Sequence, residues 1–269
     1  MKTKTNVFLL SLALLTTASL SSCNQSTSTS ENADTVETSA QNIEVNPVAH
    51  SKQFPGAELQ ITSITAEKSG TDSALLTVRY TVNNFTLTEH TEDSNAVHMA
   101  NSAEGQHIHF ILNNTPYIAL YKPENSVMVK LGSEHSLMSF LSRSYHESIK
   151  EPSAFVLKHF RVEDDGRVTE LESPKEPAIF YSRPKGEYSG KDTENILLDF
   201  YLANTDLDDG HKIEAKVNDS TFVLDSWSPY EIKNAPKGEL KVQLTLLDKD
   251  GNALSGENQS ITRTVTLKD

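Results

Sequence analysis

Hydrophobic and polar residues alternate along most of the chain after residue 54, which is the pattern of β-strands with one buried face. Turns rich in glycine, asparagine, aspartate and proline separate these short segments. Regular short strands of this kind predict an all-β fold made of two antiparallel, immunoglobulin-like β-sandwiches. Strands are expected at residues 57–64, 74–82, 106–112, 117–121, 127–131, 136–141 and 154–162, and again at 179–182, 195–203, 212–217, 221–224, 239–247 and 260–267.

Breaks in the alternation predict how the chain is divided. Residues 163–177 contain a turn, two prolines and a run of charges, which indicates a linker. The first sandwich is therefore expected over residues 54–162 and the second over residues 178–269. Residues 23–53 are rich in serine, threonine, asparagine and glutamate without a hydrophobic period, which predicts a flexible tether.

The start of the chain predicts export and lipidation. Residues 1–22 have a basic start, an apolar run at 7–20 and small residues at the end, as in a secretory signal peptide. The apolar run is too short to span a bilayer as a permanent anchor. Residues 20–23, Leu-Ser-Ser-Cys, resemble the bacterial lipobox, so Cys23 is expected to carry lipid, including palmitate. Asn24, in place of aspartate, favours the outer membrane of a Gram-negative cell envelope.

The net charge of the chain argues against some classes of binding partner. The formal net charge is −13, and removal of residues 1–22 with Lys2 and Lys4 lowers it to −15. An acidic surface argues against nucleic acid and against broad electrostatic attraction to anionic lipids. The expected contact with the membrane is therefore the N-terminal lipid alone. Cys23 is the only cysteine, so no disulfide forms within the chain.

Two histidines share one face of the strand predicted at residues 106–112. His107 and His109 are two positions apart, which places their Cα atoms roughly 6.5 Å apart in an extended chain. Two such imidazoles can share a copper or zinc ion if a further ligand joins them. His146 is the first candidate for that ligand, and His98 is the second, with the sulfur of Met99 beside it. The alternative is a polar pair on the strand surface that binds no metal.

Two polar segments suggest an anionic ligand instead. The loop at residues 142–148 offers hydroxyl, guanidinium and imidazole groups, and residues 181–191 combine cations with two glycines. These groups could equally tie the loops to their own scaffold and to the acidic surface. The residues expected to contact such a ligand are Arg143, Ser144, Tyr145, His146, Arg183, Lys185 and Lys191.

A hydrolase is the remaining alternative. Ser142 or Ser144 could act with His146, but the chain has no Gly-x-Ser-x-Gly motif. Glu147 is adjacent to His146 and is poorly placed to orient its ring. We therefore expect a protein that is not an enzyme.

Several sequence blocks resemble a family of two-domain lipoproteins of Bacteroidota, whose members are often labelled phosphopeptide-binding proteins. The blocks are residues 101–109 (NSAEGQHIH), 140–148 (FLSRSYHES), 180–188 (FYSRPKGEY), 247–252 (LDKDGN) and 262–265 (TRTV). The likeness covers most of residues 54–268. It implies a binding role with a phosphopeptide as ligand, and it carries over no site residues. Residues 105–109 are also similar to a Gly-His-His-His strand of another periplasmic domain.

Together these features predict a non-enzymatic envelope lipoprotein that binds an anionic ligand, with copper or zinc binding as the alternative function.

Overall fold

The computed structural model describes residues 42–269, so the signal segment, Cys23 and most of the predicted tether lie outside the described residues. Within that range the regular structure is almost entirely strand, with one-turn helices at α1 (Asn95–His98) and η1 (Gly190–Thr193). Neither helix is long or apolar enough to cross a membrane. The predicted all-β fold with immunoglobulin-like sandwiches is confirmed.

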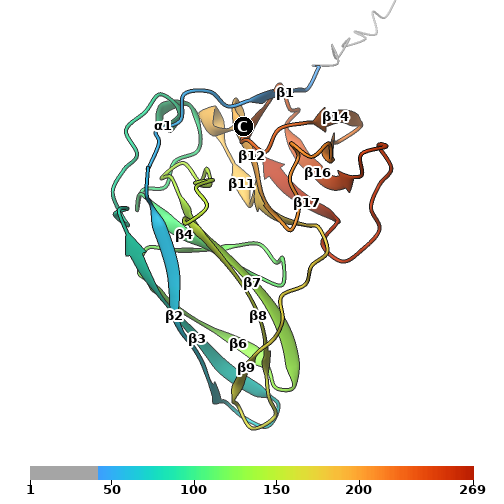
Figure 1. Ribbon diagram of the computed structural model, residues 1–269. Helices are drawn as coiled ribbons and strands as arrows, with labels where there is room; N and C mark the ends of the chain where they lie inside the picture. The colour runs from blue at the N-terminus through green and yellow to red at the C-terminus, as the bar shows by residue number, and fades with distance from the viewer. Residues whose placement is uncertain (1–41) are drawn as a thin grey trace, which may run out of the picture. The chain divides into compact units, whose positions relative to one another are not determined.

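The first sandwich packs a three-stranded sheet against a five-stranded sheet (Figure 1). Its core contains Leu76 and Val78 from one sheet and Ile108 and Phe110 from the other, which are the alternate positions that the sequence pattern assigns to a buried face. The smaller sheet has the order β2 (Glu58–Lys68), β3 (Ser73–Asn83), β6 (Glu124–Lys130). The larger sheet has the order β5 (Ile118–Leu120), β4 (His107–Leu112), β7 (Ser133–Ser142), β8 (Phe155–Val162), β9 (Val168–Glu170).

The second sandwich encloses a separate core, to which Phe200 and Leu244 contribute from opposite sheets. All of its strand pairs are antiparallel except β11 with β17. One sheet has the order β1 (Glu44–Pro47), β15 (Tyr230–Lys233), β12 (Ile196–Ala203), β10 (Ala178–Arg183). The other has the order β11 (Glu187–Tyr188), β17 (Ser260–Leu267), β16 (Gly238–Leu247), β13 (Lys212–Val217), β14 (Ser220–Leu224).

The predicted tether and linker both contain short strands. Within the tether, β1 pairs with β15, because Ile43 and Val45 pack their apolar side chains against the second core. Within the linker, β9 pairs with β8 and extends the first sandwich beyond residue 162. The segments at β1 and β9 are therefore ordered parts of the two sandwiches, not free chain.

A third apolar cluster joins the two sandwiches. Ile111 and Phe140 of the first sandwich pack with Phe180 and Tyr201 of the second, and the rings of Phe140 and Tyr201 are stacked with centroids 4.9 Å apart. Both faces of β4 are consequently buried. The face that carries the two histidines is turned toward the second sandwich, which is the feature that positions the site.

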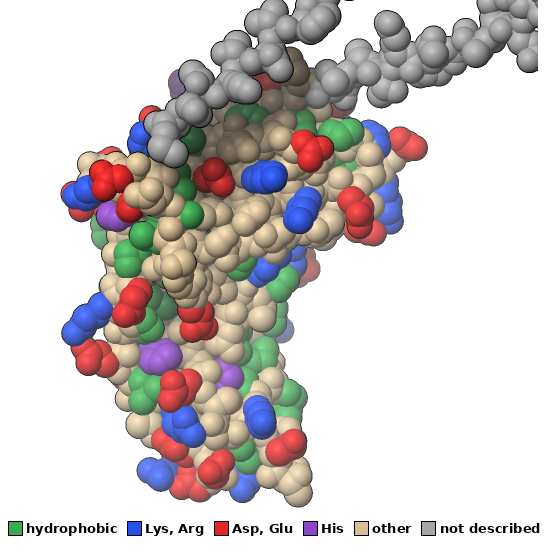
Figure 2. Space-filling model, turned by 90° about the vertical axis from the view of Figure 1, so that its right-hand side faces the viewer, with side chains coloured by type: hydrophobic (Ala, Val, Ile, Leu, Met, Phe, Trp, Pro, Cys, Tyr) green, Lys and Arg blue, Asp and Glu red, His purple; other side chains and the backbone are tan. Residues whose placement is uncertain are grey.

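Charged side chains are interspersed on the face of the molecule shown in Figure 2. Red acidic and blue basic side chains alternate there, and purple histidines lie among the acidic ones on the lower half of the view. That mixed surface contrasts with the cluster of cations described below.

A candidate metal centre

Three histidine side chains converge in the interior. His107 and His109 project from β4 and are fully buried, with 0 % exposure each. His146 comes from the turn that follows β7 and is partly buried. Its backbone has a φ of 71°, in the left-handed region that a residue with a side chain rarely adopts. Backbone strain of this kind is often found at functional sites, where the surroundings hold the residue in place.

The inward-facing ring nitrogens lie close to metal-binding spacing. His107 Nε2 is 2.9 Å from His109 Nε2 and 3.1 Å from His146 Nδ1. All three ligand atoms lie within 4.8 Å of one another. In a tetrahedral site with metal–nitrogen bonds of 2.0–2.1 Å, neighbouring nitrogens are roughly 3.3 Å apart. Small movements of the rings would therefore suffice to place an ion between them.

The outer nitrogens of the two strand histidines are held by oxygen atoms. His107 Nδ1 lies 2.8 Å from the carbonyl oxygen of Gly105, and His109 Nδ1 lies 3.1 Å from Ser182 Oγ on β10. A carbonyl oxygen only accepts, so His107 Nδ1 carries its proton and His107 Nε2 presents a lone pair inward. This is how proteins commonly orient histidine ligands of a metal.

Burial keeps the three imidazoles neutral. Desolvation lowers the pKa of His107 to about 4, against the opposing effect of the hydrogen bond that its Nδ1 donates to the Gly105 carbonyl oxygen. Burial also lowers the pKa of His109 and His146, and the charges of Arg183 and Lys185 act in the same direction on both. Neutral imidazole is the form that binds a metal ion.

Tyr117 closes one side of the histidine cluster. Its ring is stacked on His109 with centroids 3.6 Å apart and planes 7° apart. Its hydroxyl lies 3.2 Å from His146 Nδ1. Burial raises the pKa of this phenol. The hydroxyl is thus an oxygen atom at the edge of the group of inward-facing nitrogens.

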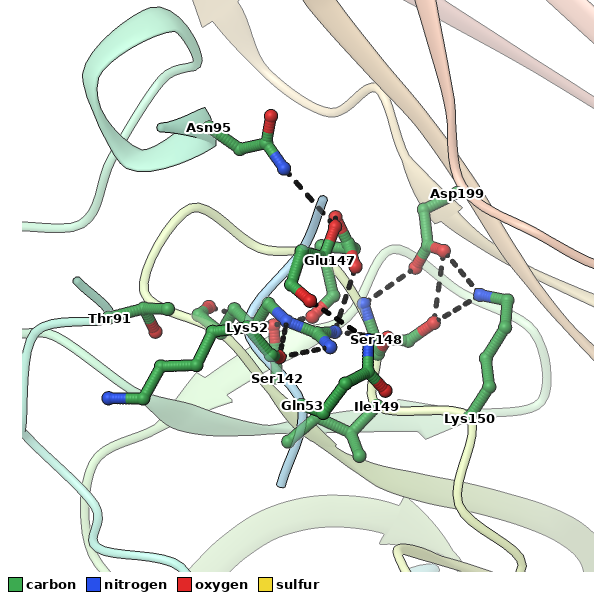
Figure 3. A network of polar contacts seen from close by, with 12 residues as sticks. Lys52, Gln53, Thr91, Asn95, Ser142, Glu147, Ser148, Ile149, Lys150 and Asp199 are labelled. Carbon is green, nitrogen blue, oxygen red and sulfur yellow. Dashed lines mark hydrogen bonds and ion pairs between the residues drawn. The ribbon is translucent and has the colours of Figure 1, made fainter. Parts of the chain in front are cut away.

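A polar network positions the loop that carries His146 (Figure 3). Arg143 forms an ion pair of 2.8 Å with Glu147, and both side chains are buried. The Arg143 guanidinium also donates to the carbonyl oxygens of Lys52 and Ser148, at 2.6 Å and 3.0 Å. On the other side of the loop, Ser148 Oγ donates to Asp199 of the second sandwich at 2.9 Å. The loop is therefore clamped to both sandwiches.

Three residues predicted to contact a ligand have internal partners instead. Arg143 is buried with Glu147, as described above, and Ser144 Oγ accepts a hydrogen bond of 3.0 Å from the Thr91 amide. Tyr145 is buried and donates its hydroxyl to Asp93 at 2.8 Å. Each of them fixes the loop, because its polar groups are directed at the protein itself.

The remaining predicted metal ligands lie outside the cluster. His98 is exposed on α1, and Met99 packs in a small apolar group with Tyr145 and Leu197. The group that can share one ion consists of His107, His109 and His146. Of the two residues predicted as a third ligand, the structure brings His146 to the pair and leaves His98 at the surface.

The predicted cationic segment is divided between two environments. Arg183 and Lys185 lie against the Tyr117 ring, at 5.4 Å and 4.2 Å from its centroid, and so beside the histidine cluster. Lys191 is exposed in η1. Because Arg143 belongs to the clamp around Glu147, the predicted anion-binding residues do not form one surface.

The geometry gives no support to serine catalysis. Ser142 Oγ donates to the carbonyl oxygens of Arg143 and Glu147, at 3.1 Å and 3.3 Å. His146 Nδ1 is directed at His107 and Tyr117. Among the described residues, no hydrogen bond joins His146 to Ser142 or Ser144.

A cleft of about 530 Å³ lies apart from the histidine cluster. Its lining includes His135 and His159, whose ring nitrogens are hydrogen-bonded to serine hydroxyls. These two histidines therefore have hydrogen-bond partners of their own outside the cluster.

Comparison with known proteins does not assign the chain to a family. No protein-family model matches the chain, and no curated protein matches it. Among solved structures, the fibronectin(III)-like modules of CbhA from Clostridium thermocellum match at 12 % sequence identity, over 78 % of this chain and 94 % of that chain, with a TM-score of 0.27. A likeness at that score carries no argument about the function of this chain.

Proposed function

We propose that this protein is a lipid-anchored envelope protein that binds one copper or zinc ion through His107 Nε2, His109 Nε2 and His146 Nδ1. The observation that carries the proposal is the convergence of these three nitrogens within 4.8 Å in the protein interior. The lipid anchor and the envelope location are supported by the lipobox-like sequence that ends at Cys23.

Hydrogen bonding alone accounts poorly for this arrangement. His107 Nε2 has a single lone pair in the plane of its ring, yet two ring nitrogens approach it, at 2.9 Å and 3.1 Å. One lone pair makes one good hydrogen bond, so one of the two contacts is left without an aligned donor. A bound cation accepts all three lone pairs at once, which removes this conflict.

The donor set favours copper or zinc among the common metals. Imidazole nitrogen suits both ions, whereas calcium and magnesium prefer oxygen ligands. The metal-ligand group found among the described residues contains three histidines and no carboxylate. Three-histidine sites leave a further coordination position, which the Tyr117 hydroxyl or a water could fill.

The site favours metal binding over the anionic ligand expected from the sequence. The histidines meet at one point, whereas Arg143 and Arg183 lie in different networks. The resemblance to lipoproteins labelled phosphopeptide-binding identifies no ligand-binding residue in either network.

Elemental analysis tests the proposal. The protein is purified without a His tag, exposed to zinc or copper, and desalted before the metal is measured. We expect about one ion per chain in the wild type and near-complete loss in the double variant His107→Ala, His109→Ala, because one histidine alone holds these ions weakly. The control is His159→Ala, which removes a histidine bonded to Ser136 in the same sandwich and is expected to keep the metal. Equal, sub-stoichiometric metal in the wild type and the double variant would rule out the site.

A further inference from the structure

Three cations of the second sandwich have no acidic partner among the described residues. Arg183 on β10, Lys185 in the turn after it, and Arg263 on β17 form no ion pair with a carboxylate among residues 42–269, although the chain has a net charge of −13. Arg183 is only 7 % exposed. A buried charge without a counter-ion is unfavourable, because it loses its hydration and gains little in return.

The donors of these cations are directed at neutral groups. Arg183 Nη1 donates to the Tyr188 hydroxyl at 3.0 Å, and Lys185 Nζ donates to the Tyr117 carbonyl oxygen at 2.7 Å. Arg263 donates to the carbonyl oxygens of Thr262 and Asn114. Burial lowers the pKa of Lys185 and of Arg263, as expected where no negative charge offsets the desolvation. The surroundings thus supply hydrogen-bond acceptors but no anion.

A small cavity is lined by two of these cations. Its volume is about 60 Å³, and Ser182, Lys185 and Arg263 are part of its lining. A single water needs about 10–15 Å³ by the same kind of measure, so the cavity can hold a group of several atoms. It is too small for a peptide or a sugar.

Buried donors without a hydrogen-bond partner also lie in this part of the second sandwich. Tyr181 and Arg263 both line the cavity, and the Tyr181 hydroxyl and Arg263 Nε are buried without a hydrogen-bond partner among the described protein atoms. Arg183 Nε, one residue along β10 from Ser182, is also buried and unpaired. Buried polar groups normally have partners, so this part of the second sandwich holds more hydrogen-bond donors than acceptors among the described protein atoms.

We infer that this cavity binds one small oxyanion, such as a carboxylate or phosphate group, held by Lys185 and Arg263. Guanidinium and ammonium groups form their strongest hydrogen bonds with such anions. The anion site is inferred from the cavity and the cations alone, so it does not require that the histidines bind a metal.

The oxyanion site would also be coupled to the histidine cluster. Ser182 lines the cavity and its Oγ lies 3.1 Å from His109 Nδ1. A metal ion beside Arg183 and Lys185 is repelled by both, and an anion bound next to Lys185 offsets part of that repulsion. Each ligand would then strengthen the binding of the other.

Calorimetric titration tests the site on chelator-treated protein, so that the result is independent of metal binding. Inorganic phosphate and acetate are titrated separately at constant ionic strength, with chloride as the balancing salt. We expect saturable binding at a ratio of one to one for at least one of them, and the preferred probe distinguishes a phosphate site from a carboxylate site. Lys185→Gln and Arg263→Gln are each expected to weaken binding about tenfold, because each removes one charged donor.

Lys191→Gln is the matched control. It removes an exposed cation of the same segment that does not line the cavity, so we expect an affinity within about twofold of the wild type. Thermal unfolding verifies that each variant is folded. Absence of saturable heat with both anions in the folded wild type overturns the inference, and that result needs no variant. Weakening by Lys191→Gln equal to that by Lys185→Gln overturns it as well, because the anion then lies elsewhere.

Discussion

The hydrogen bonds around His107 and His109 determine which nitrogen of each ring faces inward. Gly105 and Ser182 hold the two Nδ1 atoms, so both Nε2 atoms are left for the centre of the cluster. His146 presents Nδ1 because its turn places the ring from the opposite side, in a backbone conformation with φ of 71°. The orientation of the two histidine ligands therefore depends on Gly105 and Ser182, which are not metal ligands themselves.

Ser182→Ala tests that dependence. Loss of the hydroxyl removes the hydrogen-bond partner of His109 Nδ1, which fixes the tautomer of that ring. We expect the zinc affinity, measured by competition with a chromophoric chelator, to fall about 10–100-fold, the usual effect of losing a partner of a ligating histidine. Ser136→Ala is the control, because Ser136 bonds His159 outside the cluster. Unchanged affinity in Ser182→Ala would mean that this hydrogen bond does not orient a ligand.

Residue patterns predicted part of this site. Strand parity placed His107 and His109 on one face, and the structure has them there. Parity could not identify Ser182 as their neighbour, because β10 approaches β4 only through tertiary packing, and Ser182 could have been suspected only from its position in the cation-bearing segment. Tyr117 directly precedes β5, which pairs with β4 in the same sheet, so the expected strands at residues 106–112 and 117–121 could have placed it near the histidines.

At the scale of elements, the loop after β7 depends on the buried pair of Arg143 and Glu147. Burial raises the pKa of the Glu147 carboxyl, and the Arg143 charge opposes that shift. The sequence suggested that Arg143 binds a ligand, with a role in tying the loop to its own scaffold as the alternative. Only the folded chain shows that Glu147 and the Lys52 carbonyl occupy its donors.

Arg143→Ala is expected to destabilise the fold strongly. Removal of the guanidinium leaves Glu147 buried without its partner, which costs about 3–5 kcal/mol in free energy of unfolding. Urea denaturation measures the change. Arg79→Ala is the comparison, because its pair with Glu124 is half exposed and is worth less than about 1 kcal/mol. Similar losses in the two variants would contradict the role given to the Arg143 pair.

Strands were predicted well where alternation was long and poorly where it was short. The segments that became β3, β8, β12 and β16 have eight or more residues and a clear apolar face. In contrast, β1 and β15 have four residues each, and their pairing joins segments that are far apart in the sequence. So short a run carries too little pattern to be distinguished from a tether or a loop.

At the scale of the whole described chain, the second sandwich covers β4, which would otherwise have one face exposed to solvent. The sequence predicted two sandwiches but not their contact, because the cluster of Ile111, Phe140, Phe180 and Tyr201 uses residues that each sandwich could equally have placed in its own core. That contact covers the histidine face of β4 and excludes water from it. The alternative placed the histidine pair on the strand surface, and that placement was wrong for this reason.

X-ray absorption spectroscopy of the zinc-loaded protein tests the three-histidine metal centre, since it reports the atoms bound to the ion. We expect three imidazole nitrogens at about 2.0–2.1 Å, with one further oxygen or nitrogen ligand. In His146→Ala the imidazole signal should fall to two rings, whereas in His159→Ala it should remain at three. A first shell made of oxygen alone, or an imidazole count that His146→Ala leaves unchanged, would contradict a metal centre built from His107, His109 and His146.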